Sequence, residues 1–323
     1  MRQMRLASTF FGILFGAAPF LAAAQPAPSI ARVGILTPQT NAAAEELRNG
    51  LRELGYIEGK HVAFEAPQFD GTMDQANRLA HDLVDSKVDV IVAGSTTAAR
   101  AAMQATSDIP VVFAGLADPL VSGLASSLSK PGRNGTGVSV IATELYPKRL
   151  EMLHRLAPRA KQTAYLRTSS NPDSRLLDTT RRAARQLGVR LQTYDARDAR
   201  ELDSVLSAIR AEGADALLVG GNVGSTAAME KIARFSRNAR LPAVFPYREW
   251  HRHEVLMSYG PSLKDVGLRS ARYVDKILKG AKPAELPIEQ IAKYDLVINL
   301  RVARQTGIKV AEDLLLRADE VIR

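Results

Sequence analysis

The chain has no cysteine among its 323 residues. Disulfide bonds, thiolate metal sites and cysteine nucleophiles are therefore all excluded. Aromatic residues are also few, at 6% of the chain with one Trp, and no block of basic residues occurs. Although the formal net charge is +9, the basic side chains are scattered along the sequence. This pattern is typical of a solvated surface, and we expect no nucleic-acid partner.

The N-terminal segment predicts a signal peptide. Arg2 and Arg5 precede an apolar stretch over residues 6–21, and residues 22–24 form an A-x-A cleavage site before Gln25. The apolar stretch contains Gly and Pro, and it is shorter than the ~20 residues that a membrane-spanning helix needs. We therefore expect residues 1–24 to be removed and the mature protein to be exported to the periplasm.

From Ile30 onward, short β-rich runs alternate with helical patterns, which predicts an α/β fold with parallel sheets covered by helices. The expected strands are residues 31–37, 61–66, 88–94, 109–115, 135–141, 162–168, 189–196, 214–221, 241–247 and 254–260. The expected helices lie near residues 42–54, 72–86, 96–106, 119–129, 145–156, 174–187, 198–211, 225–239 and 262–279, with a short one around 302–305.

Matching segments recur in the two halves of the chain. LRELG and ARQLG each end a helix, VDVIVAG matches ADALLVG, and IPVVF matches LPAVF. One continuous sheet would need ten or more strands, which exceeds the usual size. We therefore predict a duplicated α/β unit, with residues 30–143 and about 261–286 in the first lobe and residues 144–260 and about 287–323 in the second.

No catalytic or metal-binding pattern emerges from the sequence. His251 and His253 supply only part of the three or four ligands that zinc requires. The segment GGNVGST lacks the Lys of a phosphate-binding loop, and GRNGTG precedes a strand instead of following one. There is also no G-x-S-x-G nucleophile elbow. We expect neither enzymatic activity nor a cofactor or metal ion.

Polar side chains follow the ends of several predicted strands in both halves. Open α/β sheets bind ligands at the carboxyl ends of their strands, so these residues are expected to meet in a cleft between the lobes. Hydrogen-bonding groups without an activated nucleophile favour binding over catalysis. The predicted ligand-binding residues are Thr37, Gln39, Ser95, Thr96, Thr97, Asp118, Ser169, Asn171, Asn222, Tyr247 and Glu249.

The segment Gly94-Ser95-Thr96-Thr97 is the most informative of these loops. It ends an apolar run and starts a helical pattern. A helix start presents free backbone N–H groups, which suit a carboxylate or another polar group. The alternative is an ordinary helix cap, in which Ser95 serves only its own helix.

Several stretches along the mature chain carry a family resemblance. They include RVGILTP, LRELGYIEGKHVAFE, DVIVAGSTTAA, IPVVFAGLADPLVSGL, SLSKPGRNGTGVS, KRLEMLHRLAP, LMSYGPSLKD and YDLVINLRVARQTG. The chain closely resembles the bacterial ABC-transporter substrate-binding family, whose members include tryptophan- and tyrosine-type solute receptors. This resemblance implies the fold of type 1 periplasmic binding proteins, with two Rossmann-like lobes and a three-segment hinge. It also implies that Ser95, Thr96 and Thr97 face the cleft, with Asp118 nearby.

The resemblance implies a receptor that closes on a small-molecule solute and delivers it to an ABC permease in the inner membrane. We also expect the protein to be a monomer. We expect hinge bending near residues 142–145, 258–262 and 284–288. A receptor that feeds a sensor kinase, or a periplasmic enzyme on the same fold, remains an alternative. A transcriptional regulator would need a helix-turn-helix module where this chain has its predicted signal peptide.

The expected ligand is a small polar molecule, either amino acid-like or a small carboxylate. Arg167 and Thr168 depart from the Asn-rich loop that many relatives carry at this place, whereas Asn171 and the following Pro fit it. Tyr247 and Phe113 are the only obvious aromatic candidates to contact a ligand ring. Both observations argue against an aromatic amino acid as the ligand.

Overall fold

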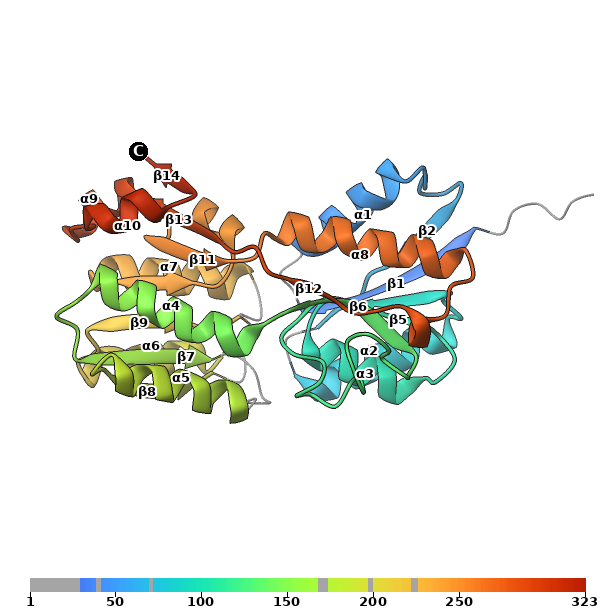
Figure 1. Ribbon diagram of the computed structural model, residues 1–323, viewed down its shortest axis with the longest axis horizontal. Helices are drawn as coiled ribbons and strands as arrows, with labels where there is room; N and C mark the ends of the chain where they lie inside the picture. The colour runs from blue at the N-terminus through green and yellow to red at the C-terminus, as the bar shows by residue number, and fades with distance from the viewer. Residues whose placement is uncertain (1–29, 39–41, 70–71, 168–173, 197–199, 222–225) are drawn as a thin grey trace, which may run out of the picture.

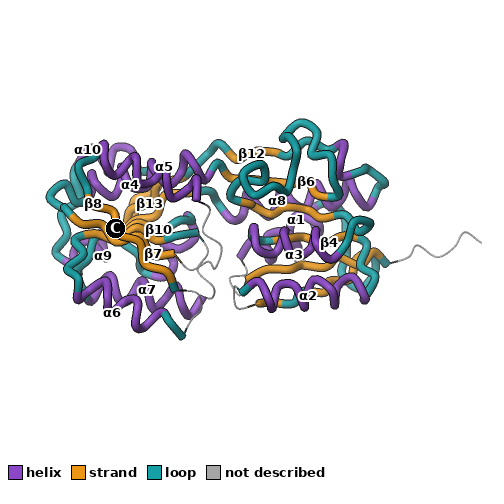
Figure 2. Tube along the Cα trace, turned by 90° about the horizontal axis from the view of Figure 1, so that it is seen from below, coloured by secondary structure: helices purple, strands orange, loops and turns teal. Residues whose placement is uncertain are grey.

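The computed structural model describes residues 30–38, 42–69, 72–167, 174–196, 200–221 and 226–323. They form two α/β lobes that lie side by side (Figure 1). Each lobe holds one sheet of seven described strands, and Figure 2 shows the strands of each lobe between helices. The predicted α/β fold with two mostly parallel sheets is confirmed.

The first lobe is built on a sheet with the strand order β2-β1-β4-β5-β6-β12, with β3 beside β1. Its strands are β1 (Ala31–Pro38), β2 (Val62–Glu65), β3 (Gln68–Phe69), β4 (Val90–Ala93), β5 (Val111–Leu116), β6 (Gly135–Val140) and β12 (Glu289–Ile291). Its helices are α1 (Ala42–Glu53), α2 (Met73–Asp85), α3 (Thr96–Ala105), α8 (Leu263–Leu278) and the short 3-10 helix η2 (Pro283–Glu285).

The second lobe has the strand order β8-β7-β9-β10-β11-β13-β14. Its strands are β7 (Gln162–Arg167), β8 (Arg190–Asp195), β9 (Ala216–Val219), β10 (Ala243–Phe245), β11 (Met257–Gly260), β13 (Asp295–Asn299) and β14 (Glu320–Ile322). Its helices are α4 (Ala142–Leu156), α5 (Ser174–Gln186), α6 (Leu202–Ala211), α7 (Thr226–Asn238), the 3-10 helix η1 (Arg248–His253), α9 (Leu300–Thr306) and α10 (Glu312–Arg317).

With β3 set aside, β2-β1-β4-β5-β6 of the first lobe and β8-β7-β9-β10-β11 of the second follow the same doubly wound order, in which the first strand in the chain lies between the next two. The two lobes therefore share one topology, as expected if one α/β unit is repeated. The central strands β4 and β9 are buried at every position. Parallel strands with helices on both faces are buried in this way, which explains their continuous apolar runs VIVA and ALLV.

The helix expected at residues 119–129 is wrong, because this segment forms turns instead. Asp118 accepts hydrogen bonds from the backbone N–H groups of Leu120 and Val121 at 3.0 and 3.1 Å, which closes an Asx turn. Gly123 then takes a positive φ of 70°, which interrupts any helix. The corresponding connection of the second lobe, between β10 and β11, holds only the 3-10 helix η1.

Three segments cross between the lobes (Figure 1). They are Ile141 between β6 and α4, residues 261–262 between β11 and α8, and residues 292–294 between β12 and β13. The third crossing lies later than the expected segment 284–288, because β12 pairs in parallel with β6 of the first sheet. This pairing also places residues 289–291 with the first lobe, whereas the sequence prediction assigned them to the second.

Two of these crossings are joined directly. The backbone N–H of Ile141 donates a hydrogen bond of 3.2 Å to the hydroxyl of Tyr294. The ring of Tyr294 in turn lies 6.0 Å from that of Tyr259, which comes from the end of β11 next to the remaining crossing. The connecting segments therefore form one small hydrogen-bonded and aromatic cluster.

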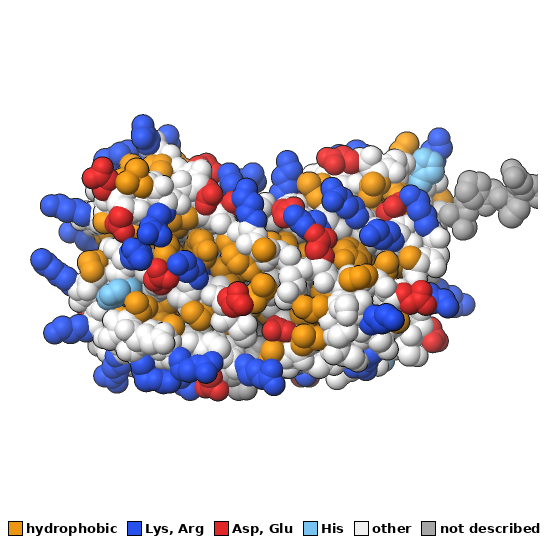
Figure 3. Space-filling view, in the orientation of Figure 1, with side chains coloured by type: hydrophobic (Ala, Val, Ile, Leu, Met, Phe, Trp, Pro, Cys, Tyr) orange, Lys and Arg blue, Asp and Glu red, His pale blue; other side chains and the backbone are white. Residues whose placement is uncertain are grey.

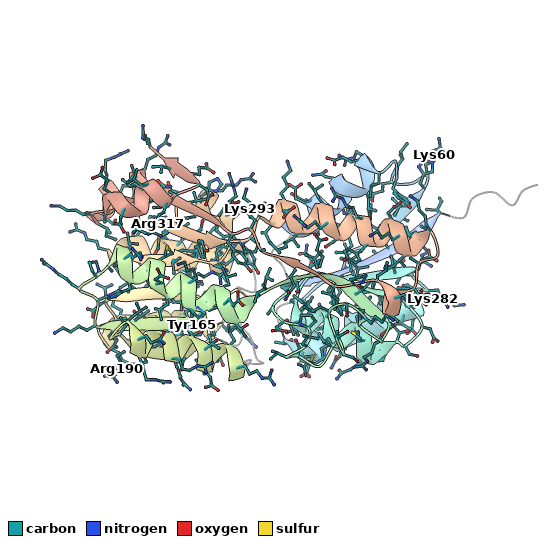
Figure 4. The ribbon with its side chains drawn as sticks, in the orientation of Figure 1. Lys60, Tyr165, Arg190, Lys282, Lys293 and Arg317 are labelled. Atoms are coloured by element: carbon teal, nitrogen blue, oxygen red, sulfur yellow. The ribbon has the colours of Figure 1, made fainter. Side chains whose placement is uncertain are left out.

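Along the described chain, no helix combines the length and the hydropathy that a membrane crossing requires. On the face drawn in Figure 3, Lys and Arg side chains are spread around both lobes and are interspersed with acidic ones. Figure 4 marks Lys60, Lys282 and Arg190 at the outer parts of the two lobes. This distribution agrees with a solvated basic surface.

Candidate functional site

A cavity of about 320 Å³ lies between the lobes. The first lobe contributes residues that follow β4, and the second contributes residues from α4, β7 and the end of β9. These strands flank the point in each sheet where the strand order reverses, which is the usual ligand position in open α/β folds. The volume falls in the range of about 300–1,000 Å³ that is typical of small-molecule sites.

The wall of the first lobe is the N-terminus of α3. The hydroxyl of Ser95 accepts a hydrogen bond of 3.1 Å from the N–H of Ala98, so Ser95 is the helix cap. Thr96 and Thr97 occupy the first two helical positions and line the cavity. Backbone N–H groups at these positions have no acceptor within their own helix, and the helix dipole favours negative charge beside them.

The approach of β4 to β1 at this wall depends on Gly94. A Cβ atom at Gly94 would lie 2.6 Å from the Cγ2 atom of Thr37, closer than real side chains approach one another. Thr37 is itself 6% exposed and packs behind the cavity wall. The sequence Gly-Ser-Thr-Thr thus combines a close strand contact with the start of a helix.

The wall of the second lobe contains Tyr146, Tyr165 and Tyr247. The hydroxyl of Tyr146 accepts a hydrogen bond from the N–H of Gly221, and its ring lies 5.6 Å from that of Tyr165. A Cβ at Gly221 would lie 3.1 Å from the Tyr146 hydroxyl and 3.5 Å from the Tyr247 hydroxyl, so both hydroxyls converge on this glycine. Figure 4 marks Tyr165 on β7, which packs against α4 through this ring contact.

The phenols of Tyr165 and Tyr247 are neutral over the physiological pH range. Burial, with a smaller contribution from the neighbouring Tyr146, raises the pKa of Tyr247 to about 12. The same two causes raise the pKa of Tyr165 well above its ordinary value. The cavity therefore presents hydroxyl groups that both donate and accept hydrogen bonds.

Arg149 of α4 is the largest fully buried side chain among the described residues, with 2% of its surface exposed. Its Nε donates to the carbonyl of Tyr259 and its Nη2 to the carbonyl of Pro246, both at 2.7 Å. Its guanidinium carbon also lies 4.7 Å from the centre of the Tyr146 ring. Its Nη1 is buried and finds no hydrogen-bond partner in the described part of the chain.

Arginines surround the cavity from both lobes. Arg100 of α3 lines it from the first lobe, and Arg149, Arg167 and Arg175 line it from the second. Arg167 forms a bidentate pair with Asp195, with N–O distances of 2.7 and 2.6 Å. The Nε of Arg100, like the Nη1 of Arg149, is buried and has no partner among the residues with described coordinates.

The structure separates the predicted site residues into groups. Ser95, Thr96, Thr97 and Tyr247 line the cavity. Asp118 caps its own turn and lines a neighbouring recess, which shares Val121 and Arg175 with the cavity.

Two further predicted residues lie behind the wall. Thr37 packs against Gly94, and Glu249 accepts hydrogen bonds from the hydroxyl of Ser262 at 2.8 Å and from the N–H of Lys264 at 3.3 Å. Glu249 therefore holds the start of α8, next to a lobe crossing. Phe113, considered above as a ring contact for a ligand, is fully buried in the core of the first lobe. The remaining candidates, Gln39, Ser169, Asn171 and Asn222, lie outside the described residues.

Sequence reasoning missed Tyr146, Tyr165 and Arg149. Tyr146 and Arg149 are three residues apart on α4, so they share one helix face. The sequence did carry one signal of this wall: a Tyr and an Arg lie three positions apart near the start of a helix that follows a strand. An apolar-looking helix face is ordinarily core, and only the position of α4 against the first lobe turns this face into a cavity wall.

The two histidines considered as metal ligands contact different groups. Nδ1 of His251 lies 2.7 Å from the carbonyl oxygen of Arg248, and Nδ1 of His253 lies 3.4 Å from Oε1 of Glu230. Within the described ranges, no cluster of three His, Asp or Glu side chains is placed to hold a metal ion.

The chain matches a family whose description is ABC transporter substrate binding protein, over residues 32–322. It is 23% identical over 263 residues to a tyrosine-binding protein of Clostridioides difficile strain R20291, a match that covers 81% of this chain and 75% of the relative. Its fold is similar to that of a conserved domain protein from Vibrio cholerae, with a TM-score of 0.83 and 27% identity over 91% of this chain and all of the other. It is also similar to an ABC domain from Streptococcus pneumoniae solved in complex with L-Trp, with a TM-score of 0.81 and 26% identity over 91% of this chain and 100% of that one.

Proposed function

Because the chain belongs to the ABC transporter substrate-binding protein family, we propose that it is the solute-binding component of an ABC import system. It binds one small molecule between its lobes and delivers this molecule to a permease in the inner membrane. From the predicted signal peptide, we infer that this step takes place in the periplasm. The protein acts as a carrier and releases its ligand chemically unchanged.

The observation that carries this proposal is the cavity between the lobes, at the carboxyl ends of both sheets. Hydrogen-bonding groups from α3 face tyrosines and arginines of the second lobe across it. A site shared between two lobes is completed only when the lobes approach each other, so ligand binding and closure are coupled. We infer that the lobes close as near-rigid bodies about the three crossing segments.

The wall also indicates the size and shape of the ligand. Three tyrosines and the apolar side chains of Leu145, Leu176 and Leu177 surround the polar groups. Such a wall accommodates a ligand with a planar or apolar body and one polar end. In the sequence, few aromatic residues could be identified as contacts for a ligand ring, which argued against an aromatic ligand. The three tyrosines of the wall remove that objection. Relatives named for tyrosine and L-Trp support a ligand of similar size.

A thermal-shift screen tests the proposal. The mature protein is screened against amino acids, small carboxylates and purines. A ligand at 100 times its Kd adds about 2.7 kcal/mol of stability. At about 2–4 °C per kcal/mol, we expect the Tm to rise by roughly 5–10 °C.

Closure and chemistry are then tested with the ligand that the screen identifies. Small-angle scattering is expected to show a smaller radius of gyration at saturation, and mass spectrometry is expected to recover the ligand unchanged. An unchanged radius at calorimetrically confirmed saturation would contradict closure. Formation of a product would favour the enzyme alternative.

A further inference from the structure

We propose that the cavity selects an anionic ligand, namely a carboxylate without an ammonium group, and that Arg149 binds the carboxylate. This inference rests on the proposed solute-receptor function and specifies its ligand class. It makes Arg149 a specificity-determining residue, and it distinguishes this protein from a receptor for a zwitterionic amino acid.

The charges of the wall point to an anion. Four arginines line the cavity, and none of its described lining residues is Asp or Glu. An amino acid brings an ammonium group together with its carboxylate, and a buried ammonium requires an acidic or carbonyl partner. Beside uncompensated arginines that group is repelled, because like charges a few ångströms apart cost several kcal/mol in a partly desolvated site.

Two of the four arginines already interact with other groups of the protein. Arg167 is neutralised by its bidentate pair with Asp195 at the edge of the second sheet. Arg175 makes an interaction of its own and also borders the neighbouring recess. The uncompensated positive charge in the cavity therefore comes from Arg149 and Arg100.

Arg149 carries the strongest evidence. The ion pairs described for α4 join Lys148 and Arg155 to Glu151, and Arg155 also to Asp313, but none involves Arg149. Two carbonyls and a tyrosine ring hold the Arg149 guanidinium in place, which leaves Nη1 buried and without a partner in the described structure. An unpaired donor on a buried cation is costly, and a carboxylate in the cavity supplies the missing acceptor and the opposite charge.

The opposite wall is suited to the same ligand. The N-terminus of α3 directs the N–H groups of Thr96 and Thr97 toward the cavity, and the dipole of this ten-residue helix favours an anion there. The buried Nε of Arg100, without a partner in the described ranges, lies on the same helix. An anion is thus stabilised from both lobes, which also favours the closed arrangement.

Matched ligands test the inference on the unaltered protein. Isothermal titration calorimetry compares L-tyrosine with desaminotyrosine, which lacks the ammonium group, and with tyramine, which lacks the carboxylate. The same comparison is made for L-tryptophan, indolepropionate and tryptamine. We expect the carboxylate of at least one series to bind tenfold or more tightly than its amino acid, and neither amine to bind.

Variants then identify the residue responsible. Arg149→Met is expected to weaken binding of the carboxylate by about 10- to 100-fold, the effect of one or two hydrogen bonds to a charged group. Arg155→Met, six residues farther along α4, is the matched control and leaves binding unchanged. Because Arg149 also holds two backbone carbonyls, Arg100→Gln serves as a second variant, and a fivefold or greater loss of carboxylate affinity is expected for it.

Each result has a defined meaning. Tighter binding of an amino acid than of its deaminated analogue overturns the inference, as does unaltered carboxylate affinity in a folded Arg149→Met protein. Binding of only neutral or cationic solutes in the broader screen also overturns it, while the solute-receptor function stands. Failure of every compound in that screen to bind counts against the inference and the proposed function together.

Discussion

The contact between Gly94 and Thr37 allows a stability prediction that requires no ligand. In Gly94→Ala, the new Cβ would lie 2.6 Å from Cγ2 of Thr37, whereas the next atom of that side chain, Cβ, lies 3.3 Å away. Both residues sit at the carboxyl ends of neighbouring parallel strands, β4 and β1, which cannot separate without disturbing the sheet. The methyl group of Thr37 is therefore the principal obstacle to a side chain at position 94.

The size of the effect follows from two opposing terms. Overpacking of a tight site costs about 1–3 kcal/mol. Replacing Gly by Ala restricts the unfolded chain and returns about 0.4–1 kcal/mol. We expect a net destabilisation of about 1–2 kcal/mol, which lowers the Tm by roughly 2–8 °C.

Thr37→Ser removes the obstructing methyl group and serves as the second arm of a double-mutant cycle. Alone, it is expected to cost about 1 kcal/mol for the lost buried methyl group. In its presence, Gly94→Ala is expected to change the Tm by no more than about 2 °C, which corresponds to a coupling of about 1–2 kcal/mol between the two positions. Differential scanning calorimetry of the four proteins measures this coupling. An equal loss from Gly94→Ala in both backgrounds would refute the steric argument.

Three further predictions concern the cavity, the hinge and the pH response. Thr96→Val with Thr97→Val removes two hydroxyls from the cavity wall. Each hydrogen bond to a charged group contributes about 1.5–3 kcal/mol, so we expect ligand binding to weaken by 10-fold or more. The control Thr193→Val on β8 leaves the affinity measured by calorimetry unchanged. Tyr294→Phe removes the acceptor for a backbone N–H at a lobe crossing, so the free energy of unfolding should fall by about 0.5–1.5 kcal/mol, and an unaltered urea midpoint would contradict this. Burial raises the pKa of Tyr247 to about 12, whereas its value in the unfolded chain is 10. The neutral phenol therefore stabilises the fold fully below pH 10. This contribution, at most about 2.7 kcal/mol, is lost as the pH rises toward 12. In a pH series of unfolding curves, Tyr247→Phe should be less sensitive over that window, and equal sensitivity would show that this phenol is not responsible.

The fold was largely predictable because its signals are local. Continuous apolar runs such as VIVA and ALLV predict strands that are buried on both faces, and recurrent segments predict a duplicated unit. The helix expected at 119–129 does not form, because Gly123 takes a positive φ and Asp118 closes an Asx turn. Turn chemistry decided that segment against its hydrophobic pattern.

By itself, the sequence also determined one wall of the candidate site. Gly94 to Thr97 join a strand to a helix, so the residues that form the helix start are adjacent in the chain and could be identified from it. The opposite wall depends on contacts between distant segments. Arg149 is held by the carbonyls of Pro246 and Tyr259, and Tyr146 meets Gly221. Only the tertiary structure brings these groups together. The periodicity of α4 does not show which of its faces lies in the core and which borders the cleft, because this depends on how the two sheets pack.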